Sequence, residues 1–216
     1  MNTYYLVRHG QTVWNTLGQT QGHGNSPLTD LGERQASELA EALKDYPIDT
    51  IYCSDLGRAI QTAEIVGMKL RIEVRPTNLL REMGFGVWEG MPLKNIEKKY
   101  PDTFRMWREE PDKVHIPEGE ALSVVRDRTN ELIESLNNKY DNKHILLVSH
   151  SVTVRVMLLE FLESHVRNLY RIKQDNTALN IVEYRDYGPV IMNMNDTRHL
   201  KTDKNKGSNK KTSALE

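Results

Sequence analysis

The sequence of 216 residues lacks several features that mark particular classes of protein. Its single cysteine, Cys53, excludes a disulfide within the chain and suits a reducing cytosol. No apolar run approaches the roughly 18 residues that are needed to cross a bilayer. The first residues also lack the basic and apolar stretches of a secretory signal. We therefore expect a cytoplasmic protein that does not associate with a membrane.

A strong net charge is also lacking, because 29 Lys and Arg nearly balance 30 Asp and Glu. No global field therefore favours nucleic acid or a membrane surface as the partner. The balance is uneven, since residues 198–216 carry six Lys or Arg against two acids. This segment has few apolar residues and no aromatic side chain to stack on bases, so we expect a disordered tail that does not bind nucleic acid.

Short runs rich in β-branched and aromatic residues alternate with segments of helical spacing. The predicted strands are Tyr4–Val7, Thr50–Cys53, Leu70–Val74, Ile145–Val148, Ala178–Tyr184 and Val190–Met192. The predicted helices are Thr29–Leu43 with Thr29 as N-cap, Ser54–Met68, Glu120–Leu136 and Ser151–Leu162. This alternation predicts a three-layer α/β domain over residues 1–197, with a mainly parallel central sheet and helices on both faces. Residues 83–117 are predicted to form a partly helical excursion near the active site.

Polar residues follow three of the predicted strands. The stretch "YLVRHG" places Arg8 and His9 after the first strand, and "ILLVSHS" places His150 after a later one. Arg58 lies just inside the helix that follows the strand Thr50–Cys53. Because the carboxyl ends of parallel strands share one edge of the sheet, we expect these side chains to cluster there.

Such a cluster has a specific chemistry. Two arginines, two histidines and a helix N-terminus at Ser151 would form a positive pocket rich in hydrogen-bond donors. Two guanidinium groups match the oxygens and the charge of a phosphate dianion. The same positive charge would lower the pKa of His9 below its reference of about 6.5 and leave a nucleophilic nitrogen. The pattern therefore predicts phosphoryl transfer to His9.

Two other interpretations compete with this one. A histidine after an apolar strand is more often a structural residue, but three equivalent strand ends together favour catalysis. A metal site formed by His9, His23 and His150 lacks the usual ligand spacing, and the arginines would repel a divalent cation. We therefore expect no metal and no cofactor.

Six motifs in this order resemble the histidine phosphatase superfamily, the phosphoglycerate mutase-like clan, over roughly the first 195 residues. They are "LVRHGQTVWN", "QGHGNSPLTDLGERQA", "IYCSDLGRAIQTAEI", "LREMGFGVWEG", "PEGEALSVVRDR" and "ILLVSHSVTVR". The resemblance implies that His9 is the nucleophile and becomes a phosphohistidine. It also implies that Arg8, Arg58 and His150 bind the phosphoryl group.

The resemblance extends to further site residues. Asn15, Gln21 and Gly22 would add hydrogen bonds to phosphate or substrate. Glu82, in "LREMGFG", would protonate the leaving oxygen and then activate water, since an alkoxide is a poor leaving group. A surface ion pair of Glu82 with Arg81 is the alternative interpretation of this residue.

Two positions depart from the family pattern. Asn25 stands where many relatives have Asp, and Ser151 follows His150 where glycine is frequent. Both are small polar residues near the predicted pocket, and Ser151 is a candidate substrate-binding residue. These departures bear on the substrate rather than on the chemistry.

The clan contains phosphatases and mutases that share these residues. Family mutases carry a longer, basic insertion after the motif of Glu82. Here that segment is short, and Met83, Phe85, Met106 and Trp107 either pack together or line the entrance. We favour a metal-independent phosphomonoesterase of the histidine acid phosphatase type, acting on a small phosphorylated metabolite. A 2,3-bisphosphoglycerate-dependent phosphoglycerate mutase is the alternative, and a non-catalytic phospholigand-binding protein a remote one. The oligomeric state is left open, a homodimer included.

Overall fold

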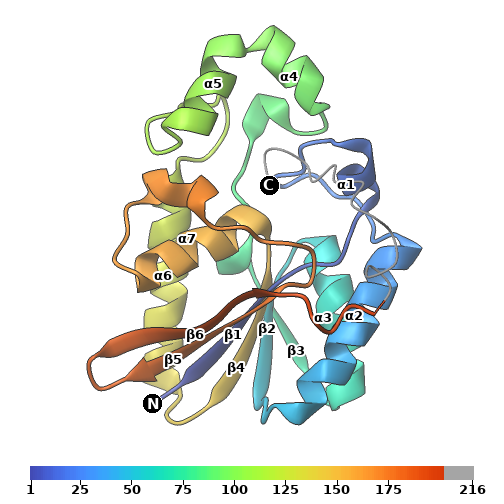
Figure 1. The fold of residues 1–216 in the computed structure, drawn as a ribbon, viewed down its shortest axis with the longest axis vertical. Helices are drawn as coiled ribbons and strands as arrows, with labels where there is room; N and C mark the ends of the chain where they lie inside the picture. Colours follow the sequence, from blue (N-terminus) through green and yellow to red (C-terminus); the bar gives the residue numbers. More distant parts are fainter. Residues whose placement is uncertain (202–216) are drawn as a thin grey trace.

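The computed structural model describes residues 1–201 (Figure 1), and residues 202–216 of the predicted tail lie outside the described residues. The strands are β1 (Thr3–Arg8), β2 (Thr50–Ser54), β3 (Val74–Thr77), β4 (His144–Ser149), β5 (Leu179–Arg185) and β6 (Gly188–Asp196). The α-helices are α1 (Val13–Leu17), α2 (Asp30–Ala42), α3 (Gly57–Leu70), α4 (Leu93–Lys99), α5 (Pro101–Glu109), α6 (Leu122–Lys139) and α7 (Ser151–Phe161). Short 3-10 turns are η1 (Leu43–Asp45), η2 (Asn78–Leu80), η3 (Gly86–Trp88) and η4 (Val166–Arg171).

The strands of the described chain form one sheet in the order β3-β2-β4-β1-β5-β6. The pairs β2–β3, β2–β4 and β1–β4 are parallel, whereas β5 is antiparallel to both β1 and β6. The predicted mainly parallel sheet is therefore confirmed. Because β1, β2 and β4 run in the same direction, the residues that follow them meet at one edge of the sheet.

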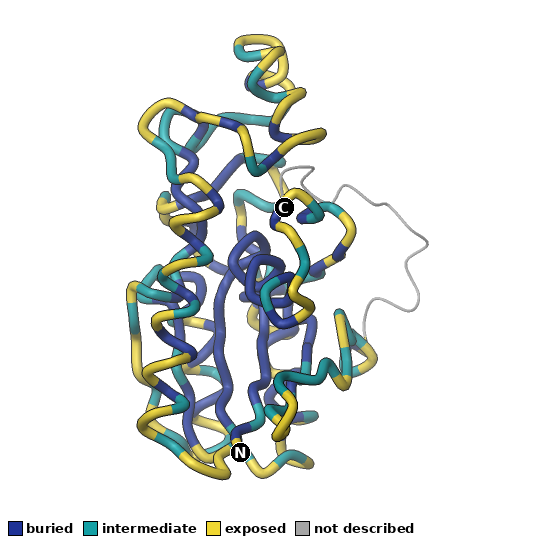
Figure 2. The backbone as a smooth tube through the Cα atoms, turned by 90° about the vertical axis from the view of Figure 1, so that its left-hand side faces the viewer, coloured by how far each residue is buried: buried dark blue, intermediate teal, exposed yellow. Residues whose placement is uncertain are grey.

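Helices cover both faces of the sheet, which confirms the predicted three layers (Figures 1 and 2). Alternate residues of β1 face opposite sides: Tyr4 and Leu6 pack with α6 and α7, whereas Tyr5 and Val7 pack with α2 and α3. Thr29 caps α2 as predicted, because its side chain accepts a hydrogen bond from the backbone N–H of Gly32.

Residues 83–117 form a partly helical segment, as predicted, at one end of the molecule (Figure 1). Met83, Phe85, Trp88 and Trp107 are fully buried in an apolar cluster that continues onto α6 and α7. The packing interpretation is therefore confirmed for Met83, Phe85 and Trp107, whereas Met106 is 40% exposed.

The predicted strand Leu70–Val74 is wrong in its position. Helix α3 continues to Leu70, Arg71 ends it in the left-handed conformation with φ 60°, and β3 begins only at Val74. The β-branched residues Ile72 and Val74 are typical of a strand, but the residues between the end of α3 and Val74 form the turn that leads back to the sheet. β3 can hold Pro76 because it is an edge strand.

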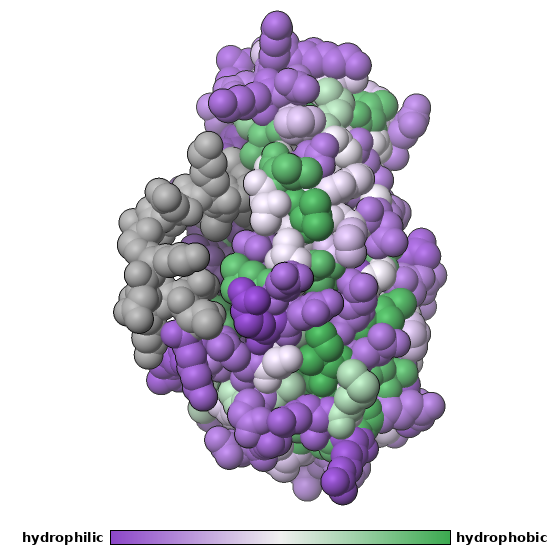
Figure 3. Space-filling model, turned by 90° about the vertical axis from the view of Figure 1, so that its right-hand side faces the viewer, coloured by the Kyte–Doolittle hydropathy of each residue, from purple (hydrophilic) through white to green (hydrophobic). Residues whose placement is uncertain are grey.

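The packed chain extends past residue 197, the predicted end of the domain. Leu200 is buried, the His199 ring nitrogen Nε2 hydrogen-bonds the hydroxyl of Thr177, and the Lys201 N–H donates to Glu38. No helix among residues 1–201 is both long and apolar enough to span a bilayer. Figure 3 shows mainly hydrophilic side chains on one face, interrupted by small apolar patches.

Candidate active site

The first part of the site lies where β1 ends. The His9 N–H donates to the Ser149 carbonyl at 2.9 Å, which extends the pairing of β1 with β4 by one residue. Gly10 then allows a close approach of α2, because a Cβ at this position would lie 2.5 Å from the carbonyl oxygen of Gly32. A glycine directly after His9 is therefore a packing requirement.

The His9 imidazole is 1% exposed and has a defined tautomer. Its Nδ1 lies 2.7 Å from the Gly10 carbonyl oxygen, which can only accept, so Nδ1 carries the proton. The lone pair of the neutral ring is therefore on Nε2. Burial, followed by the charges of Arg58 and Arg8, holds the pKa of His9 well below its usual range. The predicted direction is confirmed, with burial as the largest cause.

Arg58 joins the two histidines of the predicted cluster. Its Nε–H is shared between His9 Nε2 at 3.3 Å and His150 Nδ1 at 3.1 Å. Its two terminal nitrogens donate to the carbonyls of Gly22 and Gly24 at 2.8 and 2.9 Å. The guanidinium is thus fixed in one orientation beside the nucleophilic nitrogen of His9.

His150 and Ser151 add two polar atoms that have no partner among the described residues. Because Arg58 donates to His150 Nδ1, the proton of the neutral His150 ring lies on Nε2. Both His150 Nε2 and Ser151 Oγ are buried without a hydrogen bond. Two unsatisfied buried groups next to His9 are costly unless a ligand completes them.

Glu82 lies at the N-terminus of α7 and is 1% exposed. Its carboxylate accepts hydrogen bonds from the N–H groups of Val152 and Thr153, each at 3.2 Å, and from the Thr153 hydroxyl at 3.2 Å. Arg81 instead makes a two-pronged ion pair with Asp55, at 2.7 and 2.6 Å. The alternative of an Arg81–Glu82 surface pair is therefore wrong. Glu82 and His150 thus both lie at the N-terminus of α7.

The remaining predicted residues surround this cluster. The Arg8 guanidinium donates to the Gln174 carbonyl at 2.8 Å. Asn15 accepts from the Thr12 N–H at 3.0 Å, and the buried Gln21 accepts from the Thr12 hydroxyl at 3.1 Å. The nine predicted site residues thus lie at the ends of β1 and β4, in α1 and the turn that follows it, in the first turns of α3 and α7, and just after η2.

Sequence analysis missed two residues that hold this cluster. Asn176 donates to the carbonyl of His9 at 3.0 Å, from a loop that carries no recognisable pattern. Thr153 contacts the Glu82 carboxylate with both its N–H and its hydroxyl. Its place three residues after the N-cap of α7, typical of residues that bind anions, is a signal that could have identified it.

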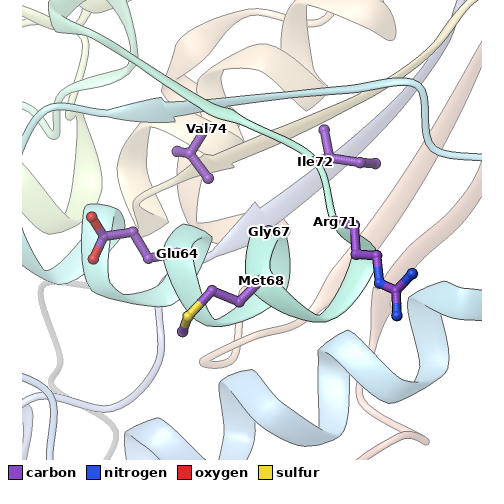
Figure 4. A pocket seen from close by; sticks show the side chains of 6 residues that line it. All are labelled: Glu64, Gly67, Met68, Arg71, Ile72 and Val74. Carbon is purple, nitrogen blue, oxygen red and sulfur yellow. The ribbon is translucent and has the colours of Figure 1, made fainter.

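A metal centre and a second pocket are the other kinds of site to consider within residues 1–201. No group of three or more His, Cys, Asp or Glu side chains is arranged there to hold a metal ion. A surface hollow beside α3 and β3 is lined by Glu64, Gly67, Met68, Arg71, Ile72 and Val74 (Figure 4). This hollow lies where β3 begins, so it opens near the amino ends of the parallel strands, away from the histidines.

The two buried histidines predict a loss of stability in acid. In the unfolded chain they take up protons near pH 6.5, whereas burial and Arg58 keep the pKa of both well below that value in the fold. The unfolded state therefore binds more protons below pH 6.5, and each histidine costs up to about 1.4 kcal/mol per pH unit. Urea unfolding between about pH 7.5 and 5.5 should show this fall.

A pair of variants identifies the source of this acid sensitivity. The fall should become smaller in His150→Asn and stay unchanged in His115→Asn, because His115 is exposed. An equal fall in all three proteins would mean that the buried imidazoles are not its cause.

Comparisons with known proteins agree with this geometry. Residues 4–197 match the model of the histidine phosphatase superfamily (branch 1). The chain is 33% identical to phosphoserine phosphatase 1 of Hydrogenobacter thermophilus, covering 90% of this chain and 92% of that protein. It is also 33% identical to a probable phosphoglycerate mutase, GpmB, of Yersinia enterocolitica, covering 91% and 94%. The solved structure of Bacillus stearothermophilus YhfR superposes with a TM-score of 0.88 at 30% identity, covering 92% and 99%. The chain therefore belongs to the histidine phosphatase superfamily, branch 1.

Proposed function

We propose that this protein is a metal-independent phosphomonoesterase that hydrolyses small phosphorylated metabolites through a phosphohistidine on His9. One observation carries the proposal. The Arg58 guanidinium contacts both His9 and His150, and the Glu82 carboxylate lies at the helix that His150 starts. A neutral nucleophile, fixed positive charge and an acid–base group are the parts that phosphoryl transfer requires.

The first step forms the phosphoenzyme. The lone pair on His9 Nε2 attacks phosphorus while the bond from phosphorus to the ester oxygen breaks on the opposite side. Arg8 and Arg58 offset the charge on the equatorial oxygens, and the His150 Nε2–H donates a hydrogen bond to one of them. The leaving alkoxide takes a proton from Glu82, because a phosphate dianion bound beside this carboxyl favours its protonated form.

The second step returns the enzyme to its starting state. Glu82, now ionised, takes a proton from a water molecule whose oxygen attacks phosphorus. The phosphorus–nitrogen bond breaks, its electron pair returns to His9 Nε2, and inorganic phosphate leaves. The buried Ser151 hydroxyl adds a donor to the phosphate or to the attacking water.

The segment of residues 83–117 favours hydrolysis over isomerisation. A mutase must hold a small anionic substrate with additional cations while its phosphohistidine is kept from water. Residues 83–117 instead turn aromatic and aliphatic side chains inward. Their six Lys and Arg side chains are exposed: Lys94, Lys98, Lys99, Arg105, Arg108 and Lys113. The likeness to a phosphoserine phosphatase makes phosphoserine the first alkyl phosphate to assay.

The proposal predicts hydrolysis of a panel of phosphomonoesters that persists in EDTA and is inhibited by vanadate. Phosphate release should exceed any isomerisation of 3-phosphoglycerate, measured in an enolase-coupled assay with a bisphosphate primer. Primer-dependent isomerisation faster than hydrolysis would make the protein a mutase. Saturable binding of phosphate esters with no turnover would make it a binding protein.

A further inference from the structure

The turn at residues 21–24 connects Arg58, which contacts His9 and His150, with Glu82. Its carbonyls at Gly22 and Gly24 receive the Arg58 guanidinium, as described above. A hydrogen bond of 2.8 Å from the Gly24 N–H to the Gln21 carbonyl closes the turn. Gly22 has φ +52°, and a Cβ there would collide with the Glu89 carboxylate. The turn is therefore tight, and its position fixes that of Arg58.

His23 carries the same turn across to Glu82. Its Nε2 lies 2.9 Å from the Glu82 carbonyl oxygen, which can only accept, so this nitrogen carries a proton. The His23 N–H also donates to Glu89 at 2.9 Å, and the same Glu89 oxygen accepts from the Phe85 N–H at 3.0 Å. Two separate links thus join the turn to the segment that begins at Glu82.

Arg128 of α6 holds the Glu82 carbonyl from another direction. Its guanidinium donates to this carbonyl at 3.1 Å and to the Leu79 carbonyl at 2.8 Å. The Arg128 side chain is only 13% exposed, so these bonds are largely shielded from water. The backbone of Glu82 is therefore held by two cation-forming side chains from different elements.

Glu120 aligns both of these side chains. Its Oε2 lies 3.6 Å from His23 Nε2 and 3.6 Å from Arg128 Nη2, and it accepts from the Gly84 N–H at 2.7 Å. The nearby Glu120 carboxylate raises the pKa of His23, so the ring holds its proton more strongly. The nearby acids Glu89 and Asp55 act in the same direction.

We propose that His23 and Arg128 are positioning residues for Glu82: they fix its backbone carbonyl so that its carboxyl meets the leaving oxygen of an ester held by Arg58. This inference rests on the proposed role of Glu82 in phosphoryl transfer. The Glu82 carboxylate has to break its hydrogen bonds to α7 as it transfers a proton. The backbone carbonyl of Glu82 takes no part in the proton transfer, so its hydrogen bonds can fix the residue throughout the cycle.

The test compares two classes of leaving group. An alkoxide needs a proton from Glu82, whereas p-nitrophenolate leaves without one, so misplacement of Glu82 harms alkyl esters selectively. The value of kcat/KM reports the steps up to transfer onto His9. We expect His23→Leu and Arg128→Met to lower kcat/KM for phosphoserine, or for the best alkyl phosphate found, by about 10- to 100-fold. For p-nitrophenyl phosphate we expect a loss of less than about threefold.

Matched variants separate positioning from general damage. His23→Gln keeps a donor near the place of Nε2 and should recover most of the alkyl-ester activity. Arg126→Met on the same helix should match the wild type, because Arg126 pairs with Asp127 and does not reach Glu82. If Arg128→Met fails to fold, the His23 pair decides the question, since His23 is 37% exposed and its replacement leaves the core intact.

The outcomes also distinguish this inference from the proposed function. Equal losses on both ester classes, or none on either, in His23→Leu would overturn the positioning role while the wild type still hydrolyses both. A wild type that hydrolyses neither ester would overturn the proposed function itself.

Discussion

Replacing His9 by alanine should lower kcat/KM for every phosphate ester by about 10⁴-fold or more, the scale seen when a nucleophile is removed. The imidazole Nε2 is the atom that we expect to attack phosphorus, because it carries the lone pair of the neutral ring and lies beside the Arg58 guanidinium. The loss should be equal for alkyl and aryl esters, because both have to transfer the phosphoryl group to His9.

Two controls make this loss informative. His115→Ala removes an exposed histidine and should keep wild-type activity. The His9→Ala protein should remain folded, because the buried ring that it loses is uncharged. It should still bind vanadate weakly through Arg8 and Arg58. Robust hydrolysis by His9→Ala would show that another group, or water directly, attacks phosphorus.

Replacing Glu82 by glutamine should give a loss that depends on the leaving group. For alkyl esters we expect kcat/KM to fall by about 10²- to 10⁴-fold, the range for a general acid. For p-nitrophenyl phosphate the transfer to His9 should stay fast, but the second step lacks its base. A rapid burst of p-nitrophenolate, equal to the amount of enzyme, should therefore precede slow turnover.

Glutamine suits this test because it is nearly the same size and keeps an oxygen acceptor for α7. Its amide oxygen can take the place of Oε1, which accepts from the Thr153 N–H and hydroxyl, so that only the acceptor of the Val152 N–H is lost. Thermal unfolding of Glu82→Gln should therefore stay close to that of the wild type. A uniform loss on both ester classes, without a burst, would show that Glu82 binds the phosphate rather than moving protons.

The sheet edge could be predicted from the sequence because its determinants are local. Buried parallel strands have nearly continuous apolar sequences, and the first polar residues after them must lie at one edge. His9, Arg58 and His150 were found in this way, and their mutual hydrogen bonds are consistent with it. The motifs added Glu82, which no strand end would have identified.

Other parts of the site depend on contacts between distant segments and were not predictable. Asn176 reaches His9 from a loop 167 residues further along the chain. His23 was considered only as a metal ligand, yet it donates to the Glu82 carbonyl, 59 residues away. Such bonds to backbone atoms leave no pattern in the sequence, because any carbonyl can accept them. The start of β3 was misplaced for another reason: the left-handed turn that ends α3 lies at Arg71 rather than at a glycine, so the sequence carries no signal for it.

The central claim is that His9 carries the phosphoryl group during turnover. The most direct measurement is the intact mass of Glu82→Gln, quenched in base during its burst with p-nitrophenyl phosphate, followed by peptide mapping. We predict an adduct of one phosphoryl group per chain, stable in base, lost in acid, located on His9 and absent from His9→Ala. A burst without any adduct, or an adduct on another residue, would contradict the mechanism.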